Sequence, residues 1–277
     1  MNDIPVLDFA HLPWPVEIPT HMVFDVDGTL TDHHSVTSED TIAALRRLHD
    51  AGIPITLATG RILPAGQAIL DRAGVPGWVV GGAGGTVSNG HELVSVHTLP
   101  PELIERALGR GRELGLSCYF YLAEDIVIDE EAPHSPELLL NANEGRPIHR
   151  ADLDTLDWSE VTKVTFSSDA HTIDRVLPGL AEEFDGLVRG HPLFLDLPLP
   201  GITKWEGITE ALAAQGLDAS TGIGIGDSGN DVPWLPHIGY PIAAPDSPPE
   251  VLTVVDYRLP DVENPVAKLI EAILWNR

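Results

Sequence analysis

Two carboxylates, Asp25 and Asp27, stand two residues apart in the segment FDVDGTL, directly before a glycine at position 28. The residues that lead up to them, THMVFDV at 20–26, are apolar enough for a buried strand that ends at this acidic turn. At the end of a strand the two carboxylates point the same way and can share a cation. An Asp-Gly pair after a strand is, on its own, usually just a turn, so a chemical role needs support from elsewhere in the chain.

Three further polar clusters have a comparable placement, each at the end of an expected strand or the start of an expected helix. They are Thr59-Gly60-Arg61, Lys204 after the return LDLPLPGIT, and Asp227-Ser228-Gly229-Asn230-Asp231. Taken singly, each can be explained without a functional role, as a common tripeptide, a solvated lysine and a turn rich in Asp and Asn. Ligands of an open parallel sheet bind at the carboxyl ends of its strands. The four clusters, in this order and at these positions, therefore predict a single site.

Alternating strands and helices predict the scaffold that brings these clusters together. We expect strands at residues 20–26, 53–59, 78–82, 220–226, 238–243 and 253–257, and helices at 38–50, 62–73, 204–215 and 263–275. In the first helix Ile42, Leu45 and Leu48 share one face, and Gly74 is placed to end the second. This alternation predicts an α/β fold with a Rossmann-like parallel sheet.

The middle of the chain has strand and helix signals of its own. We expect helices at residues 101–114 and 171–184, and strands at 116–122, 125–129 and 161–166. This pattern predicts an α+β domain, residues 89–189, inserted into a core domain made of residues 1–88 and 190–277. Within that core domain, residues 1–19 form an N-terminal extension.

Charge and composition narrow the class of protein. The 277 residues carry 42 acidic against 16 basic side chains, a net charge of −26, which repels nucleic acids and anionic membranes. No apolar run reaches the length of a membrane span, and the acidic, proline-rich start is unlike a signal peptide. Cys118 is the only cysteine, so no internal disulfide can form. We expect a cytoplasmic protein without a nucleic-acid or membrane partner.

The four clusters resemble the signature of the haloacid dehalogenase (HAD) superfamily, which is a DxDGT strand end, a Ser/Thr strand end, a lysine and a GDxxND cluster. The TGR form of the second cluster and the long insertion before Lys204 resemble the Cof-type branch, whose inserted domain is called a type IIB cap. The resemblance extends over residues 20–277. Two departures from that branch, at Gly81-Gly82-Ala83 and at 243–247, lie outside the catalytic clusters.

The resemblance implies a Mg²⁺-dependent phosphatase that hydrolyses a small phosphomonoester, such as a sugar phosphate or a similar polar metabolite. Asp25 would attack phosphorus and form an aspartyl-phosphate, and Asp27 would protonate the leaving alcohol and later deprotonate water. A carboxylate and a phosphate dianion repel by roughly 8 kcal/mol at about 4 Å and an effective dielectric of about 20. Mg²⁺, held by Asp25, Asp227 and the backbone carbonyl of Asp27, would offset this repulsion.

Other residues are expected to hold the substrate. Thr59 would donate its hydroxyl hydrogen to the phosphoryl group and Lys204 would supply a positive charge. Asp231 would orient the substrate, metal-bound waters or Lys204. The residues expected to bind substrate are Thr59, Gly60, Lys204, Asn230 and, in the cap, Arg189. Further candidates for anion contact are Arg61, which could instead be a structural or gate residue, and, in the cap, Arg146, Arg150, Lys163 and His191.

Two alternatives stay open from the sequence. A phosphomutase would form the same aspartyl-phosphate on Asp25 but return the group to a second hydroxyl. A non-catalytic phosphometabolite-binding protein would keep the scaffold and the site without turnover.

Overall fold

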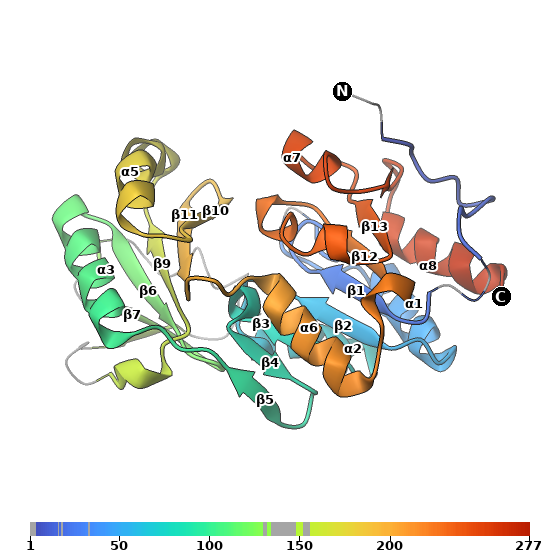
Figure 1. Ribbon diagram of the computed structural model, residues 1–277, viewed down its shortest axis with the longest axis horizontal. Helices are drawn as coiled ribbons and strands as arrows, with labels where there is room; N and C mark the ends of the chain where they lie inside the picture. The colour runs from blue at the N-terminus through green and yellow to red at the C-terminus, as the bar shows by residue number, and fades with distance from the viewer. Residues whose placement is uncertain are drawn as a thin grey trace.

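The computed structural model describes residues 4–15, 17, 19–32, 34–129, 132–133, 148–151 and 156–277. These residues form two lobes, each built on its own β-sheet (Figure 1). The larger sheet comes from the two ends of the chain and the smaller sheet from its middle. The predicted α/β fold, with a parallel-sheet core and an inserted α+β lobe, is confirmed.

The larger sheet has the strand order β14-β13-β12-β1-β2-β3-β4-β5. Its strands are β1 (Met22–Asp25), β2 (Ile55–Ala58), β3 (Trp78–Gly81), β4 (Thr86–Ser88), β5 (Leu93–Val96), β12 (Ile223–Gly226), β13 (Tyr240–Ala243) and β14 (Tyr257–Arg258). All neighbours from β14 to β3 are parallel, whereas β4 and β5 add antiparallel pairs. The chain runs outward from β1 to β3 on one side and from β12 to β14 on the other. The winding direction therefore reverses between β1 and β12, where open α/β sheets bind their ligands.

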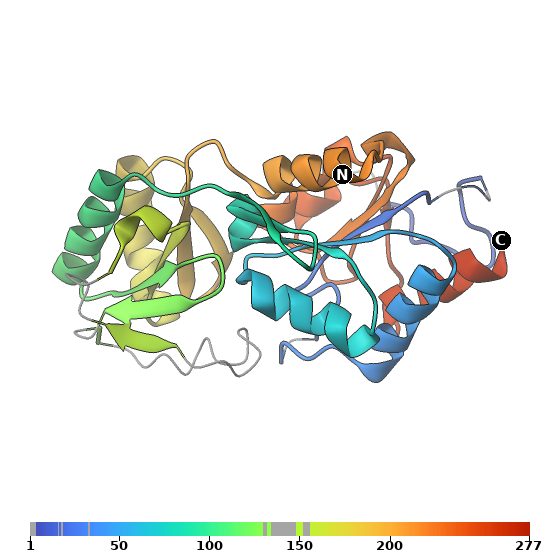
Figure 2. The same ribbon diagram turned by 90° about the horizontal axis from the view of Figure 1, so that it is seen from below.

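Helices cover both faces of this sheet (Figure 2). One face packs against α1 (Glu39–Asp50), α2 (Leu63–Ala73) and α8 (Pro265–Trp275), and the other against α6 (Lys204–Gln215) and α7 (Pro249–Leu252). Strand β1 contributes to both cores, because Met22 and Phe24 pack on the first face and Val23 on the second. Four short 3₁₀ turns complete this lobe: η1 (Gly82–Gly84), η4 (Ala219–Thr221), η5 (Gly229–Asp231) and η6 (Leu235–His237).

The helix boundaries follow local signals in the sequence. Helix α1 begins after Ser38, whose hydroxyl accepts the N–H of Thr41, and α2 ends at Gly74, which adopts the left-handed conformation with φ of +67°. The strand expected at residues 253–257 is only partly present. A short helix, α7, starts at Pro249 directly after Pro248, and strand β14 does not begin until Tyr257.

The smaller sheet has the order β10-β11-β9-β6-β7-β8. Its strands are β6 (Ser117–Tyr121), β7 (Ile126–Asp129), β8 (His149–Ala151), β9 (Lys163–Ser167), β10 (Val188–His191) and β11 (Phe194–Pro198), with the 3₁₀ turn η3 (Trp158–Glu160) before β9. Helices α3 (Pro101–Leu114) and α5 (Ala170–Glu183) pack on one face over an apolar core. The opposite face meets the larger lobe, where Tyr119 and Tyr121 form an apolar cluster with Ile62 and Ala65.

The strands of the smaller sheet do not begin and end where the inserted domain, residues 89–189, was expected to begin and end. Strand β5 pairs with β4 in the larger sheet, and β10 and β11 pair next to β9 in the smaller one. On this basis we propose that the chain crosses between the domains near residues 97–100 and 199–203. Arg146, one of the expected anion-binding residues, lies outside the described residues.

The N-terminal extension packs along the edge of the larger sheet. Leu7 donates its N–H to the carbonyl of Arg258 at 2.9 Å, and Arg258 donates in turn to the carbonyl of Pro5 at 3.0 Å. Trp14 is 8% exposed, and its ring centroid lies 5.4 Å from that of Tyr240. The extension thus covers the backbone of β14 and contributes an aromatic side chain to the core.

Two expectations from composition concern features away from the site. Cys118 is a buried free thiol whose pKa is raised to about 12 by burial, which suits an inert core residue. Among the residues that the structure describes, none of the helices combines the length and apolar character that a membrane crossing needs.

Replacing Trp14 with Ala should lower the free energy of unfolding by about 3 kcal/mol, because a large buried side chain is removed from the core. Urea unfolding followed by circular dichroism measures this change. Trp275→Ala is the matched control, since Trp275 is 89% exposed and its loss should change the free energy by less than about 0.5 kcal/mol. Equal effects of the two substitutions would show that the extension does not stabilise the fold.

Candidate active site

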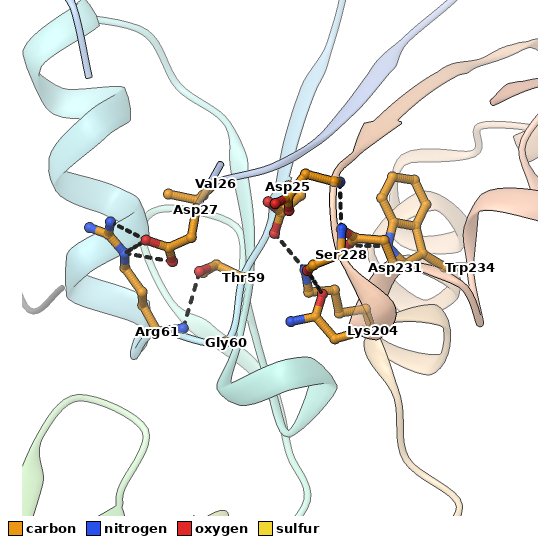
Figure 3. A network of polar contacts seen from close by, with 12 residues as sticks. Asp25, Val26, Asp27, Thr59, Gly60, Arg61, Lys204, Ser228, Asp231 and Trp234 are labelled. Atoms are coloured by element: carbon orange, nitrogen blue, oxygen red, sulfur yellow. Dashed lines mark hydrogen bonds and ion pairs between the residues drawn. The ribbon is translucent and has the colours of Figure 1, made fainter. Parts of the chain in front are cut away.

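The sequence clusters converge where β1, β2 and β12 end. Asp25 is the last residue of β1, Thr59 follows β2, and Asp227 follows β12. Strand β1 pairs in parallel with both of the other strands, so their carboxyl ends lie at one edge of the sheet. Figure 3 shows Asp25 directed at Lys204 on one side of this edge, with Thr59 next to Arg61 on the other.

Lys204 reaches Asp25 from the first turn of α6. The start of that helix is fixed by a capping box, in which Glu206 accepts the N–H of Thr203 at 2.7 Å and the Thr203 hydroxyl accepts the N–H of Trp205. Gly84 permits the close approach, because a Cβ on this residue would lie 1.9 Å from the Thr203 carbonyl oxygen. Lys204 is fully buried and donates to Asp25 Oδ1 at 2.5 Å.

Asp231 is the second acceptor for Lys204, at 2.7 Å. Its Oδ1 also accepts the indole N–H of Trp234 at 2.8 Å, and its Oδ2 accepts the backbone N–H groups of Asp227 and Ser228 at 2.9 and 3.1 Å. These four donors use the acceptor sites of the carboxylate. Orienting Lys204 was one of the three roles expected for Asp231, and this hydrogen bond is the contact that such a role needs.

Two carboxylate oxygens at this centre are buried and lack a hydrogen-bond partner within the described part of the chain: Asp25 Oδ2 and Asp227 Oδ1. Gly28 lets Asp227 come this close, because a Cβ there would lie 2.3 Å from Asp227 Oδ2. Its own φ is +80°, a conformation that also favours glycine. The site therefore concentrates negative charge that Lys204 alone does not neutralise.

The pKa values at the centre reflect this crowding. Burial and the charge of Asp231 raise the pKa of Asp25 well above its usual range, despite the opposing charge of Lys204. Burial and Asp231 likewise raise the pKa of Asp227 to about 6. Burial disfavours the charged form of Lys204, but Asp231 and Asp25 more than offset this and raise its pKa.

This donor set fits a hard divalent cation. Ligand atoms of Asp25, Asp227 and Asp231 lie within 4.8 Å of one another, and carboxylate oxygens are the ligands that Mg²⁺ prefers. The orphaned oxygens of Asp25 and Asp227 are the natural ligands. Asp231 is the less suitable donor, because its oxygens already accept four hydrogen bonds.

Asp27 points away from Asp25, toward Arg61 (Figure 3). The Arg61 guanidinium donates to both carboxylate oxygens, from Nε at 3.0 and 3.2 Å and from Nη2 at 2.6 Å. The Arg61 side chain is only 3% exposed, while that of Asp27 is 47% exposed. The backbone N–H of Arg61 donates to the Thr59 hydroxyl at 3.1 Å, so the hydroxyl can direct its own hydrogen toward a ligand.

The smaller lobe contacts the same loop through Lys163. This buried ammonium donates to the carbonyl of Gly60 at 2.9 Å, lies 3.3 Å from Asp196 Oδ1, and sits 3.9 Å from the ring centroid of Tyr121. Its N–H donors are therefore directed at protein groups, and the Lys163–Gly60 hydrogen bond connects the smaller lobe to the larger one. Lys163 was expected from the sequence as an anion contact.

The other cap candidates take different positions. Arg189 pairs with Asp174 of α5 and donates to the carbonyl of Pro192 at 3.0 Å, so its guanidinium is directed at groups of its own lobe. His191 stacks on Phe194, and its pKa is lowered by burial while the charge of Asp27 opposes that shift. Arg150 donates to the carbonyl of Asp129. Strand β10, which carries Arg189 and His191, packs against η5 of the larger lobe.

Three functional contacts were not found from the sequence: Arg61 with Asp27, Lys163 with Gly60, and Trp234 with Asp231. The spacing of Asp231 and Trp234 was an available signal, since residues three apart share one side of a helical turn. The other two contacts join residues 34 and 103 positions apart, and no local pattern marks them.

This chain is similar in sequence to known phosphatases. A family model described as haloacid dehalogenase-like hydrolase matches residues 22–270. The phosphoglycolate phosphatase of Methanothermobacter thermautotrophicus is 26% identical over 233 residues, which cover 84% of this chain and 88% of that protein. The HMP-PP phosphatase of Cronobacter sakazakii is 25% identical over 237 residues, covering 83% and 85% of the two chains.

Solved structures extend the likeness to the whole architecture. A haloacid dehalogenase-like hydrolase from Bacteroides thetaiotaomicron has a TM-score of 0.75 and 26% identity, covering 91% of this chain and 98% of its own. The HAD subclass IIB sugar phosphatase BT4131 has a TM-score of 0.75 and 24% identity, with 91% and 97% coverage, a likeness of fold alone.

Mg²⁺ should raise the melting temperature more at about pH 7.5 than at about pH 5, because protons on Asp227 and Asp25 compete with the metal at the lower pH. In the metal-free protein, a carboxyl pKa raised from 3.8 to about 6 favours the folded state at low pH. That advantage is lost as the pH rises through about 6, and Mg²⁺ compensates for it there. Thermal melts with Mg²⁺ or EDTA at both pH values measure the difference.

Asp227→Asn should abolish this stabilisation by Mg²⁺. Asp71→Asn, at an exposed position, is the control and should keep it. An equal Mg²⁺ effect at both pH values, or an undiminished effect in Asp227→Asn, would contradict the assignment of the ligands.

Lys163→Met should lower the free energy of unfolding by about 2 kcal/mol, because the Gly60 carbonyl and Asp196 lose a buried charged donor. It should also speed hydrogen exchange in the loop around Gly60, which mass spectrometry can follow. Lys268→Met, at an exposed position, is the matched control. Unchanged exchange in that loop would mean that Lys163 does not tie the lobes together.

Proposed function

The chain belongs to the haloacid dehalogenase-like hydrolase family, as its motifs predicted, and we propose that this phosphatase uses Mg²⁺ and Asp25 to hydrolyse a small phosphomonoester. The observation that carries the proposal is how the two carboxylate oxygens of Asp25 are bonded and buried. Lys204 fixes one carboxylate oxygen at 2.5 Å, while the other is buried, without a partner among the described groups, and next to Asp227. A carboxylate held in this way, with one oxygen free of protein donors, suits a residue that must both attack phosphorus and bind a cation.

In the first half of the reaction, a carboxylate oxygen of Asp25 forms a bond to phosphorus while the bond from phosphorus to the ester oxygen breaks. Asp27 gives a proton to that leaving oxygen, and the alcohol departs. In the second half, water attacks the phosphorus of the aspartyl-phosphate and Asp27 takes its proton, which releases phosphate and restores the Asp25 carboxylate.

Asp25, Asp227 and the backbone carbonyl of Asp27 are the proposed ligands of Mg²⁺. When bound, the ion supplies positive charge that offsets the repulsion between the Asp25 carboxylate and an anionic substrate. Lys204 contributes to the same balance through its contact with Asp25, and Asp231 keeps its ammonium there. The buried lysine is thus part of the charge that an incoming phosphate meets.

The phosphoryl group is proposed to lie between Lys204, Asn230 and the loop that follows β2. The Thr59 hydroxyl and the backbone of Gly60 would donate to its oxygens, as would Asn230. Asp27 is held by Arg61 in this structure. Its use as an acid and base therefore requires that it turn toward the leaving oxygen, which its half-exposed position allows.

The substrate is proposed to be a sugar phosphate or a similar polar metabolite. Relatives that cover most of the chain are named for phosphoglycolate and HMP-PP, both small phosphate compounds. The lobe that packs over the loop at Gly60 limits the room for a large substrate, and a net charge of −26 disfavours nucleic acid. His191, whose pKa responds to the charge of Asp27, and its strand neighbour Arg189 are proposed to shape this preference from the cap. We propose the cytoplasm as the location, because the one cysteine stays a buried thiol.

Phosphate release from a panel of phosphomonoesters, with Mg²⁺ or with EDTA, tests the proposal. Wild type should release phosphate only with Mg²⁺, and Asp25→Asn should lose at least about a thousandfold in kcat, because the attacking oxygen is gone. Asp71→Asn, an exposed substitution of the same kind, should keep wild-type activity.

Full activity of Asp25→Asn would remove the nucleophile assignment. Release from no ester, together with turnover of a monophosphate primed by a bisphosphate, would replace the phosphatase by a mutase. Failure to bind beryllium fluoride with Mg²⁺ would instead support a non-catalytic protein that binds a phosphometabolite.

A further inference from the structure

We propose that Trp234 is a positioning residue of this active site, whose indole N–H holds Asp231 so that Asp231 in turn fixes Lys204 on Asp25. Trp234 does not touch the reacting atoms. The consequence for catalysis rests on the proposed function, whereas the hydrogen-bonded network itself does not.

The indole donates to an oxygen that Lys204 also uses. Trp234 is fully buried, and its Nε1 lies 2.8 Å from Asp231 Oδ1, which accepts Lys204 Nζ at 2.7 Å. Figure 3 shows the indole behind Asp231, on the side away from Asp27. Two donors on one oxygen set the direction of the carboxylate plane, and hence the place of the ammonium.

The backbone holds the other oxygen. Asp231 Oδ2 accepts from the N–H groups of Asp227 and Ser228, in the turn that leaves β12. The other oxygen, Oδ1, is held by the indole N–H and by Lys204. Because Lys204 is a flexible chain, the indole is the more rigid of the two donors that fix Oδ1.

Strand β12 is built to accommodate this arrangement. Its sequence is Ile-Gly-Ile-Gly, and both isoleucines pack in the core shared with α1 and α8. The two glycines lie on the opposite face. A Cβ on Gly224 would lie 2.6 Å from the Trp234 ring atom Cζ3, and a Cβ on Gly226 would lie 2.6 Å from Asp231 Cγ. One glycine makes room for the indole, and the next makes room for the carboxylate that it holds.

The indole also decides what Asp231 can bind. A carboxylate has about four acceptor sites, and Asp231 fills them with Lys204, Trp234 and two backbone N–H groups. Its oxygens lie within 4.8 Å of ligand atoms on Asp25 and Asp227, so without the indole one site would become available to a cation. Trp234 thereby keeps Asp231 directed at Lys204.

Trp234→Phe tests the proposal, because it removes the N–H and keeps most of the ring. We expect kcat to fall about tenfold to a hundredfold, as for the loss of a hydrogen bond to a charged group, with KM within about twofold of wild type. Trp14→Phe is the matched control, since Trp14 is also a buried core indole, and it should leave both constants unchanged. A kcat for Trp234→Phe within about twofold of the control would overturn the proposal.

A second measurement does not depend on activity or on the stability of Trp234→Phe. The chain has six tryptophans, so ¹⁵N-labelled protein gives one indole N–H signal for each, and the signal of Trp234 should be strongly shifted downfield by the carboxylate. In Lys204→Met this signal should move while that of Trp14 stays in place. An unmoved Trp234 signal would show that the indole and Lys204 are not coupled through Asp231, which also overturns the proposal. If no ester is hydrolysed, this measurement still decides the network separately from the function.

Discussion

The constraint on which the rest of the site depends is the repulsion among carboxylates that share a buried space. Asp25, Asp227 and Asp231 bring ligand atoms within 4.8 Å of one another, and Lys204 is the cation that contacts two of them. One positive charge against three negative charges leaves an excess that burial makes costly. Raised pKa values of Asp25 and Asp227, caused by burial and by Asp231, are one response to this excess. A divalent cation is the other response that this geometry permits, and it is the one that leaves Asp25 ionised.

The fold holds these charges together by topology. Residues 25, 204 and 231 are far apart along the chain, and the reversal of winding between β1 and β12 places their strand ends and the start of α6 at one edge. Glycines provide the close approaches. Gly28 admits Asp227, Gly84 admits the start of α6, and Gly226 admits Asp231. A larger residue at any of these three positions would force the charged groups apart.

Much of the fold and part of the site could be predicted from the sequence. The strand ends at Asp25 and Asp227 and the helix start at Lys204 were expected, because apolar runs, caps and polar turns are local signals. The partners of the two arginines Arg61 and Arg189 were not. Arg61 binds Asp27, and Arg189 turns to Asp174 on the neighbouring helix, because side chains select partners that are close only after folding. Strands β10 and β11 were missed as well, since a proline-rich segment such as LDLPLP resembles a return loop until β9 pairs with it.

The loop after β2 serves three partners within three residues. The Thr59 hydroxyl accepts the backbone N–H of Arg61, the Gly60 carbonyl accepts Lys163 from the smaller lobe, and the Arg61 guanidinium holds Asp27. The position of the lobe and the state of the site are thus joined through one short stretch of backbone. Thermodynamic linkage makes such a connection reciprocal. A ligand that bound this loop more tightly when Lys163 contacts Gly60 would, by the same linkage, strengthen that contact by the same factor.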